Sequence, residues 1–538
     1  MDWDAIPFPK ILGERAEKFP DKVFLYFEDE TFTYGELERL TNKIGNGLMN
    51  IGIKKSSHVG IMLQNCPEFL LSWFSLAKIG AVMVPFNPNL VGALLSYMVD
   101  DSDIETLITD KKGFESLSKV KGDLEPGKLK NIILIDSPSQ EGDGDYTFYS
   151  FAEFLHFNDE RHPNIDLSFD DILSILYTSG TTGPSKGVLL PHAYYFHVSD
   201  QFRKVRRLGP DDIVYTSLPW FHGAAQACHT YPTLLANGSI VVSREFDPDT
   251  FWQDIKKYNV TQVNYLSTMI YRLWNHPPSK YDGDHQPLVF FGVPTPWNIV
   301  EDFAKRFNVV RFIEGLGQTE AQYIGADYEK TTIDKLVRGS CGKVLEGFEV
   351  KIVDEKDREL PVGETGEIVV RPKYPSIIFA GYYKKPEATA EAMRNLWFHT
   401  GDRGYCDEEG NFYFVDRLKD VIRKSGENIS SFELESIIMK YDKIEECASI
   451  PVKSETEDEI LVAITLKRGV RPEEFNHLDF LRWCKEKMPY YMIPRYIRIV
   501  DALPKTPTHK VEKYKLRNEG ITEDTWDRKK ENIRIKAL

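Results

Sequence analysis

Short apolar runs alternate with stretches whose apolar residues recur at helical spacing, from Phe24 to Ile313. The first such stretch begins at a helix-capping box, Thr33–Glu36, and continues with apolar residues at helical spacing up to Gly52. This alternation is typical of βαβ units around a mostly parallel sheet, and its two halves predict two similar α/β layers. Strands are predicted at residues 24–27, 58–63, 105–108, 131–135, 172–177, 213–217, 239–243, 260–266, 288–291 and 309–313.

From about Val350 the pattern changes to close-set strands and turns, which predicts a small β-barrel-like unit. The last hundred or so residues predict a compact α+β module. The strands expected after Val350 are 349–353, 367–371, 411–416, 448–452, 460–465 and 496–500, and the helices are 432–440 and 478–488. The expected fold class is therefore α/β, with a large N-terminal domain followed by a small α+β C-terminal domain.

One loop concentrates groups that bind phosphate. The predicted strand 172–177 runs directly into the segment Tyr177–Gly187, with the sequence YTSGTTGPSKG. Glycine lets successive backbone N–H groups turn toward one side, hydroxyls add donors, and Lys186 adds positive charge, so the loop suits a polyphosphate. Its spacing differs from that of the Walker loop. The alternative is a solvated linker, which we disfavour because linkers seldom follow a core strand. The predicted contacts are Thr178, Ser179, Gly180, Thr181, Thr182, Gly183 and Lys186.

A second candidate segment, Glu314–Glu320, follows the predicted strand 309–313. Glycines at the carboxyl end of a strand let a nucleotide approach the backbone, so we expect close ATP contacts at Gly315 and Gly317, within a predicted ATP-binding segment that also includes Leu316 and Thr319. The carboxylate of Glu320 is a hard-oxygen ligand that suits Mg²⁺. Taken alone, the segment could also be a plain glycine-rich turn with a surface glutamate.

Charge and cysteine content narrow the class of protein. The formal net charge is −15 and the isoelectric point is near 5.4, which argues against a general nucleic-acid or anionic-membrane surface. The six cysteines are scattered without a CxxC pair, as expected for reduced thiols inside a cell. We find no signal-peptide pattern and no apolar run approaching ~18 residues, so we expect a cytoplasmic enzyme without a membrane span.

The loop Tyr177–Gly187 resembles the phosphate-binding signature of the adenylate-forming (ANL) superfamily, which includes acyl- and aryl-CoA ligases, peptide-synthetase adenylation domains and insect luciferases. Further segments resemble other motifs of this superfamily, in the same order: Leu218–His222, Glu314–Glu320, His399–Asp402, Asp416–Lys419, Lys424–Ile429 and Pro504–Val511. Within the superfamily, five segments resemble the crotonobetaine/carnitine-CoA ligase branch: Phe251–Trp252, Lys257–Tyr258, Met269–Ile270, Pro277–Ser279 and Gly426–Ser430.

The resemblance implies roles for individual residues. Asp402 and Arg417 would bind the ribose and phosphate, and Lys419 would be the hinge between an ATP- and acyl-binding domain (1–417) and a mobile domain (418–538) that carries the catalytic Lys510. The residues implied in CoA binding are Ser425, Gly426 and Glu427, and those beside the acyl group are Trp220, His222, Gly292 and Val293. Lys186, Glu320 and His222 would join Lys510 in catalysis. This chain departs from the family pattern at Leu316, where tyrosine is usual, at His509, where glycine is usual, and at Ser431, where proline is frequent.

The implied function is an ATP-dependent acyl-CoA ligase. It would form an acyl-AMP with release of pyrophosphate and then transfer the acyl group to coenzyme A, with Mg²⁺ as cofactor. The acid stays open among medium-chain, aryl and betaine/carnitine-type acids. The aromatic residues Trp220, Phe221, Tyr265 and Trp274 would suit a quaternary ammonium or belong to an ordinary core. The alternatives are a stand-alone adenylation enzyme that loads a carrier protein, a luciferase-like oxygenase and a non-catalytic nucleotide-binding relative. A homodimer also stays open.

Overall fold

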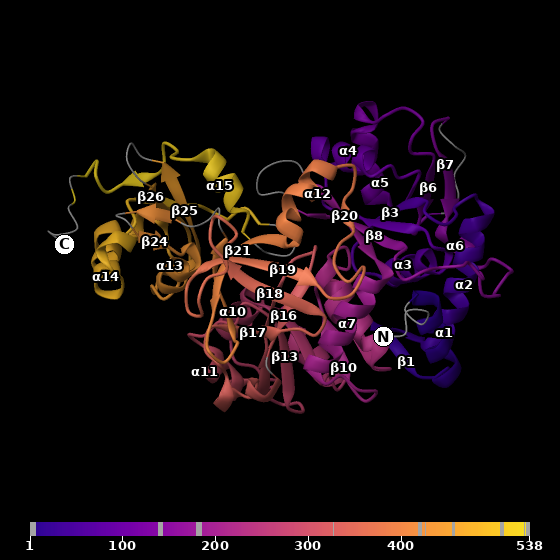
Figure 1. The fold of residues 1–538 in the computed structure, drawn as a ribbon, viewed down its shortest axis with the longest axis horizontal. Helices are drawn as coiled ribbons and strands as arrows, with labels where there is room; N and C mark the ends of the chain where they lie inside the picture. The colour runs from indigo at the N-terminus through magenta and orange to yellow at the C-terminus, as the bar shows by residue number, and fades with distance from the viewer. Residues whose placement is uncertain are drawn as a thin grey trace. The chain divides into compact units, whose positions relative to one another are not determined.

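A computed structural model describes residues 7–137, 144–178, 185–326, 328–417, 422–424, 427–453, 458–505, 511–531 and 533 (Figure 1). The chain divides into two compact units. The first unit contains Met1–Val350 and Val370–Phe398, and the second contains Lys351–Val369 and His399–Leu538. A division for domain movement between residues 417 and 418 stays a prediction, because residues 418–421 lie outside the described residues.

An eight-stranded sheet forms one layer of the first unit, in the order β20-β9-β8-β4-β3-β5-β6-β7. The strands from β8 to β7 in this order pair in parallel, whereas β9 pairs antiparallel with both β8 and β20. The bounds are β3 (His58–Met62), β4 (Val82–Pro85), β5 (Thr106–Thr109), β6 (Asn131–Leu134), β7 (Thr147–Ser150), β8 (Ile172–Thr178), β9 (Lys186–Pro191) and β20 (Gly381–Tyr382).

A seven-stranded sheet forms the second layer, in the order β14-β13-β12-β10-β11-β1-β2, and every pair except β1–β2 is parallel. The predicted α/β class with two similar layers is therefore confirmed. The N-terminal strand β1 joins β11 of this second layer, which the order of the sequence did not indicate. The bounds are β1 (Val23–Phe27), β2 (Glu30–Thr33), β10 (Ile213–Thr216), β11 (Ser239–Val242), β12 (Gln262–Leu266), β13 (Leu288–Val293) and β14 (Val309–Ile313).

The helix that the sequence predicted from its capping box is α2 (Tyr34–Asn50). The Glu36 N–H donates to Thr33 Oγ1 at 3.1 Å, and the Thr33 N–H donates to Glu36 Oε2 at 2.8 Å. The other α-helices of the first unit are α1 (Phe8–Lys18), α3 (Pro67–Ile79), α4 (Gly92–Asp101), α5 (Lys111–Lys119), α6 (Phe151–Leu155), α7 (His192–Arg206), α8 (Tyr231–Leu235), α9 (Phe251–Lys257), α10 (Ser267–Asn275), α11 (Val300–Arg306) and α12 (Pro386–Ala392). A π-helix, η3 (Ala224–Thr230), precedes α8, and short 3₁₀ turns are η2 (Lys121–Asp123), η4 (Tyr328–Lys330), η5 (Ile333–Lys335) and η6 (Arg394–Leu396).

Antiparallel strands complete the first unit: β15 (Gly315–Gly317) pairs with β16 (Gln322–Gly325), which pairs with β17 (Ser340–Val344). The chain enters the second unit along β18 (Phe348–Val353). There β22, β21, β19 and β18 are neighbours in this order, and β18 lies at the edge. Among the described strands, the predicted β-barrel-like unit is therefore an open sheet and does not close into a barrel. Its other strands are β19 (Gly366–Pro372), β21 (Phe398–Cys406) and β22 (Phe412–Arg417).

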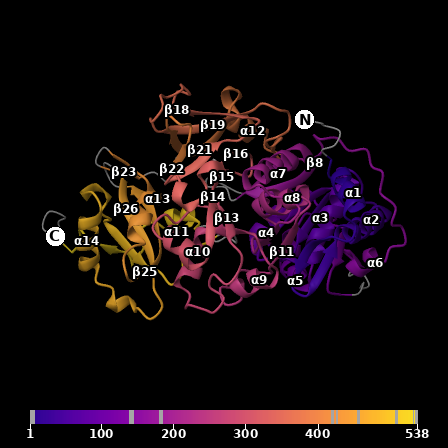
Figure 2. The same ribbon diagram turned by 90° about the horizontal axis from the view of Figure 1, so that it is seen from below.

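The remainder of the second unit is the α+β module that the sequence predicted. A four-stranded sheet has the order β25-β26-β27-β28, and helices α13 and α14 lie beside β25 and β26 (Figure 2). The bounds are β23 (Ile422–Lys424), β24 (Glu427–Ile429), α13 (Ser431–Ile438), β25 (Ile444–Lys453), β26 (Asp458–Leu466), η7 (Pro472–Glu474), α14 (His477–Lys487), η8 (Tyr490–Met492), β27 (Tyr496–Ile499), α15 (Lys513–Glu519) and β28 (Trp526–Asp527). In the described ranges, no helix is both long and apolar enough to cross a bilayer.

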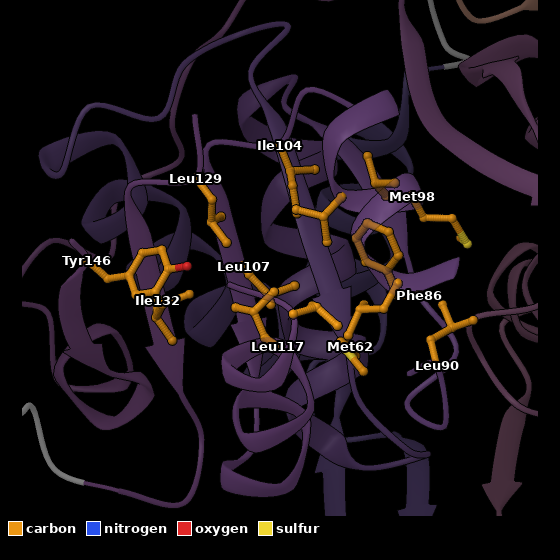
Figure 3. Packing of buried hydrophobic residues seen from close by; sticks show 14 of the residues in the cluster. Met62, Phe86, Leu90, Met98, Ile104, Leu107, Leu117, Leu129, Ile132 and Tyr146 are labelled. Carbon is orange, nitrogen blue, oxygen red and sulfur yellow. The ribbon is translucent and has the colours of Figure 1, made fainter. Parts of the chain in front are cut away.

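A continuous apolar core stabilises the eight-stranded sheet. Side chains from strands and helices meet there, among them Met62, Phe86 and Leu107 (Figure 3). The three side chains are fully buried. Because protein interiors are close-packed, this core holds the strands that carry the loop after β8 in fixed register.

We expect Leu107→Ala to lower the free energy of unfolding by about 2–5 kcal/mol, because it removes buried methyl groups and leaves a cavity. Urea denaturation followed by tryptophan fluorescence measures the change. Leu94→Ala on α4, where the side chain is 46% exposed, is the matched control and should change stability by about 0.5 kcal/mol or less. Equal effects of the two substitutions would contradict this account of the core.

Candidate active site

Strands β8 and β9 carry the two ends of the predicted phosphate loop. They pair antiparallel, and Thr178 lies opposite Lys186 at the ends of the pair. Two tyrosines fix the base of the loop to α4, since Tyr97 Oη donates to the Ser185 carbonyl at 2.9 Å and Tyr177 Oη donates to Asp101 Oδ2 at 2.7 Å. The predicted contacts Ser179, Gly180, Thr181, Thr182 and Gly183 lie outside the described residues.

Lys186 and Glu320 come from distant parts of the chain and contact the same side chain, Tyr382. The Lys186 Nζ lies 4.8 Å from the centre of the Tyr382 ring, and the Tyr382 Oη donates to Glu320 Oε1 at 2.8 Å. Strand β20 places this tyrosine by pairing with β9, so that Tyr382 lies opposite Val188. The structure therefore brings together two residues that the sequence singled out, through a third that it did not.

The chemistry around Glu320 fits a magnesium ion bound together with a nucleotide. The side chain is only 7% exposed, and its carboxylate offers the hard oxygen that Mg²⁺ prefers. The described residues contain no group of three or more His, Cys, Asp or Glu side chains that could hold a metal ion by themselves. One carboxylate completed by phosphate oxygens and water is a usual arrangement for Mg²⁺.

The glycines after Glu314 allow close backbone contact. A Cβ at Gly317 would lie 2.3 Å from Gln322 Oε1, and one at Gly315 would lie 3.0 Å from the Ile324 carbonyl oxygen. Gly315 and Gly317 lie in β15, which pairs with β16, so the segment is a strand and not the plain glycine-rich turn of the alternative interpretation. Leu316 lies between the two glycines and is half-buried, as is Thr319.

Glu314 belongs to the same segment, and sequence reasoning gave it no role. Thr295 Oγ1 donates to Glu314 Oε2 at 2.5 Å, and Tyr265 Oη lies 2.9 Å from Thr295 Oγ1. Burial of the carboxyl raises the pKa of Glu314 to about 7, because a charged carboxylate is poorly solvated there. An acidic residue directly before the first glycine was the available signal in the sequence.

The predicted acyl-binding residues differ in their surroundings. Trp220 is 0% exposed, its N–H donates to Asn65 Oδ1 and its Nε1–H donates to Thr230 Oγ1, each at 2.8 Å. Trp220 is thus fixed in the interior, and its place beside the acyl group stays a prediction. His222 is half-buried, and its Nδ1 accepts from the Ala224 N–H at 3.2 Å.

Gly292 and Val293 end strand β13 and lie opposite Tyr265 and Leu266 of β12. A Cβ at Gly292 would lie 1.9 Å from the Tyr265 carbonyl oxygen, so only glycine fits between these strands. Tyr265 itself is buried in the core of the seven-stranded sheet. The interpretation of Trp220 and Tyr265 as core aromatics, which the sequence left open, therefore agrees with their burial.

Two buried polar side chains beside Phe291 were not anticipated. Asn264 lies opposite Phe291 in the sheet, and the His229 ring centre lies 5.2 Å from that of Phe291. Within the described part of the chain, neither Asn264 Nδ2 and Oδ1 nor His229 Nδ1 has a hydrogen-bond partner. Burial lowers the pKa of His229 well below its ordinary value, so the ring is neutral near pH 7. These atoms could receive a polar ligand group or water.

In the second unit the two predicted ribose residues meet. Asp402 lies opposite Arg417 in the pair β21–β22, and Arg417 Nε lies 2.7 Å from Asp402 Oδ1. The Asp402 side chain is buried, and its N–H donates to Thr400 Oγ1 at 3.0 Å. A buried carboxylate fixed in this way suits two neighbouring hydroxyls, with Arg417 as a planar donor beside it.

Five of the predicted or noted residues lie outside the described residues: Lys419, Ser425, Gly426, His509 and Lys510. Glu427 begins β24, and its side chain is not described.

Described residues that flank the predicted hinge, the CoA-binding segment and the catalytic lysine contact one another within the second unit. The Ser431 N–H donates to Asp416 Oδ2 at 2.6 Å, and Lys513 Nζ lies 2.9 Å from Glu435 Oε1. Lys513 Nζ also donates to Ser431 Oγ at 2.5 Å, which joins the two contacts into one cluster.

Comparison with known proteins defines the class. Residues 12–383 match the model of the AMP-binding enzyme family, and residues 433–510 match the AMP-binding enzyme C-terminal domain. The chain therefore belongs to the AMP-binding enzyme family, and the predicted superfamily is confirmed.

The similarity to individual proteins gives the type of enzyme. Crotonobetaine/carnitine–CoA ligase of Salmonella agona (strain SL483) is 33% identical over 515 residues, which cover 93% of this chain and 97% of that protein. The corresponding ligase of Salmonella typhimurium (strain LT2) is equally similar. The protein is thus an AMP-forming acid–CoA ligase, with similarity to the crotonobetaine/carnitine branch that the sequence indicated.

Solved structures agree on the fold. The anthranilate CoA ligase AuaEII in complex with anthranoyl-AMP superposes with a TM-score of 0.84 at 24% identity, covering 95% of this chain and 96% of its own. ATP-bound MatB from Rhodopseudomonas palustris gives a TM-score of 0.81 at 24% identity, with 95% and 98% covered.

The raised pKa of Glu314 predicts a pH-dependent stability. The folded protein binds this proton more tightly than the unfolded chain, whose carboxyl has a pKa near 4.5, so the free energy of unfolding should fall as pH rises from about 4.5 to 7. Glu314→Gln should remove this contribution, on the order of 1 kcal/mol after allowance for partial exposure.

Thermal unfolding of the parent protein and the variant at pH 5 and pH 8 measures the difference. Glu301→Gln on α11, an exposed position, is the matched control and should follow the parent at both pH values. If Glu314→Gln and the parent lose stability in parallel between these pH values, the carboxyl does not have the raised pKa.

Proposed function

We propose that this ligase joins a carboxylic acid to ATP as an acyl-AMP, with release of pyrophosphate, and then transfers the acyl group to coenzyme A through the residues described above. The observation that carries the assignment of the site is the meeting of Lys186 and Glu320 on Tyr382, beside the base of the β8–β9 loop. A cation and a buried carboxylate at one loop base are what a magnesium–nucleotide complex requires.

In the first half-reaction, a substrate carboxylate oxygen attacks the α-phosphorus of ATP and pyrophosphate leaves in line. Negative charge gathers on the phosphoryl oxygens, and preorganised positive groups stabilise it without reorganisation. We assign this work to Lys186, the backbone N–H groups of residues 178–186, and Lys510. The carboxylate of Asp402 accepts from the ribose hydroxyls, held in place by Arg417.

Magnesium ion is part of the proposal. When bound, it neutralises charge on the phosphates, and Glu320 is the side chain that would hold it.

In the second half-reaction, the CoA thiolate attacks the acyl-AMP carbonyl carbon and AMP leaves. Lys510 and Gly426 both follow Lys419 in the chain, so rotation of residues 418–538 about Lys419 would exchange one for the other at the reacting atoms. Ser425, Gly426 and Glu427 would then accompany the thiol arm. His222 lies two residues before the π-helix η3, and we assign it to orienting the carboxylate.

For the acid, we propose a carnitine- or crotonobetaine-type substrate. The 33% identity to ligases named for these acids supports this choice, and so do the polar atoms of Asn264 and His229 beside Phe291, one residue before Gly292. A hydrocarbon chain would leave such buried polar atoms without partners, at a cost of about 1–3 kcal/mol for each. Medium-chain and aryl acids are the alternatives.

Transfer to a carrier protein is a second candidate for the acceptor, because adenylation enzymes of this superfamily share the first half-reaction. Comparison of CoA with a phosphopantetheinylated carrier protein as acceptor distinguishes the two. A cytoplasmic location and a homodimer are further expectations, and sedimentation velocity tests the dimer.

Lys510→Ala should separate the half-reactions. We expect ATP–pyrophosphate exchange to fall by about 100-fold or more, because charge on the α-phosphate loses its partner, whereas thioester formation from supplied acyl-AMP should stay within a few-fold of the parent. Lys515→Ala, which removes an exposed lysine nearby in the chain, is the control. Survival of both half-reactions in Lys510→Ala would contradict the assignment.

A panel of acids tests the substrate class. With Mg-ATP and CoA, we expect carnitine and crotonobetaine to give the highest kcat/KM for AMP release, above octanoate and benzoate by about tenfold or more. Preference for octanoate or benzoate would replace the proposed acid with one of the alternatives. Absence of AMP release with every acid would count against the whole proposal.

A further inference from the structure

Backbone hydrogen bonds hold the segment around Tyr382 against β9, the strand that follows the phosphate loop. Before Tyr382, the Ala380 N–H donates to the Leu189 carbonyl, and after it the Tyr383 N–H donates to the Gly187 carbonyl, each at 2.8 Å. The Tyr382 N–H itself donates to Thr389 Oγ1 at 2.9 Å. The backbone of Tyr382 is therefore fixed close to Lys186, which begins β9.

The same segment holds Glu320 at two points. Phe379 N–H donates to the Glu320 carbonyl oxygen at 2.9 Å, and Tyr382 Oη donates to the carboxylate at 2.8 Å. A carboxylate has about four acceptor sites, so one hydrogen bond to Oε1 fixes its orientation without preventing it from binding a cation. Hydrogen bonds to charged groups are also among the stronger ones in proteins.

The ring of Tyr382 provides the second contact. Lys186 Nζ lies 4.8 Å from its centre, within the range of a cation–π interaction. Tyr382 therefore contacts a cation through its ring and a carboxylate through its hydroxyl.

We propose that Tyr382 is a positioning residue for the magnesium–nucleotide complex: its hydroxyl orients Glu320 toward the metal and its ring orients Lys186 toward the phosphates. This inference rests on the proposed function, because it presupposes that Glu320 binds the metal. Tyr382 contacts both Glu320 and Lys186, and it reaches them from a segment outside the phosphate loop.

The two contacts can be removed stepwise. Tyr382→Phe keeps the ring and removes the bond to Glu320, so we expect it to raise the Mg²⁺ concentration needed for half-maximal nucleotide binding by about tenfold. Tyr382→Leu also removes the ring, so we expect it to weaken nucleotide binding several-fold even without Mg²⁺. Isothermal titration calorimetry with a non-hydrolysable ATP analogue, in EDTA and at increasing MgCl₂, measures both quantities without turnover.

The adjacent tyrosine provides a matched control. Tyr383 Oη donates to Asp103 Oδ2 at 2.6 Å, so Tyr383→Phe also removes one tyrosine–carboxylate bond, but not the one to Glu320. It should leave the Mg²⁺ midpoint unchanged. A double-mutant cycle tests whether the effect of Tyr382→Phe acts through Glu320. In a Glu320→Gln background, Tyr382→Phe should cause no further shift of the Mg²⁺ midpoint.

Different results would contradict the role of Tyr382 alone and the proposed function as a whole. A Mg²⁺ midpoint in Tyr382→Phe equal to that of the parent overturns the inference alone, and so does an equal shift in the Glu320→Gln background. If Tyr382→Phe does not fold, by circular dichroism, the cycle is run with Tyr382→Leu, which also lacks the hydroxyl and should shift the Mg²⁺ midpoint in the same direction. Failure of the parent protein to bind the nucleotide, or binding that ignores Mg²⁺, overturns the proposed function and the inference with it.

Discussion

The antiparallel pairing of β9 with both β8 and β20 is the constraint on which the candidate site of the first unit depends. Pairing with β8 closes the base of the phosphate loop and places Thr178 opposite Lys186. Pairing with β20 brings Tyr382 to the same place, and this tyrosine contacts Glu320. Three segments far apart in sequence thus meet because one strand has two hydrogen-bonded edges, whereas the parallel strands from β8 to β7 supply the rigid support.

The sequence predicted the parts of this fold whose determinants are local. The capping box at Thr33 marks the start of α2, and apolar runs mark most of the parallel strands. Pairing partners were harder to predict, because contacts between distant strands leave no periodic signal in either one. Strand β1 therefore joined a layer that its position did not indicate, and β20, with two residues, was too short to recognise.

The residues of the candidate site also differ in how far the sequence could predict them. Resemblance to a family identified Asp402 and Arg417, which the structure places opposite one another. It could not identify Tyr382, whose importance arises only when β20 pairs with β9. Trp220 illustrates another difficulty, since an aromatic residue beside a substrate motif and one in the core look alike in sequence. The structure adds that Trp220 is buried and makes two hydrogen bonds.

The close approach of β12 and β13 at Gly292 has a consequence for altering the acid that the enzyme accepts. With the Tyr265 carbonyl oxygen 1.9 Å from where a side chain would begin, any larger residue at Gly292 would push the two strands apart and break the parallel ladder between them. In the proposed acyl site, substitutions that keep the two strands paired are thus limited to the neighbours of this glycine, such as Val293, Asn264 and His229. If the acid binds where we propose, its selectivity would change through side chains on either side of the strand pair, and not at the point where the strands touch.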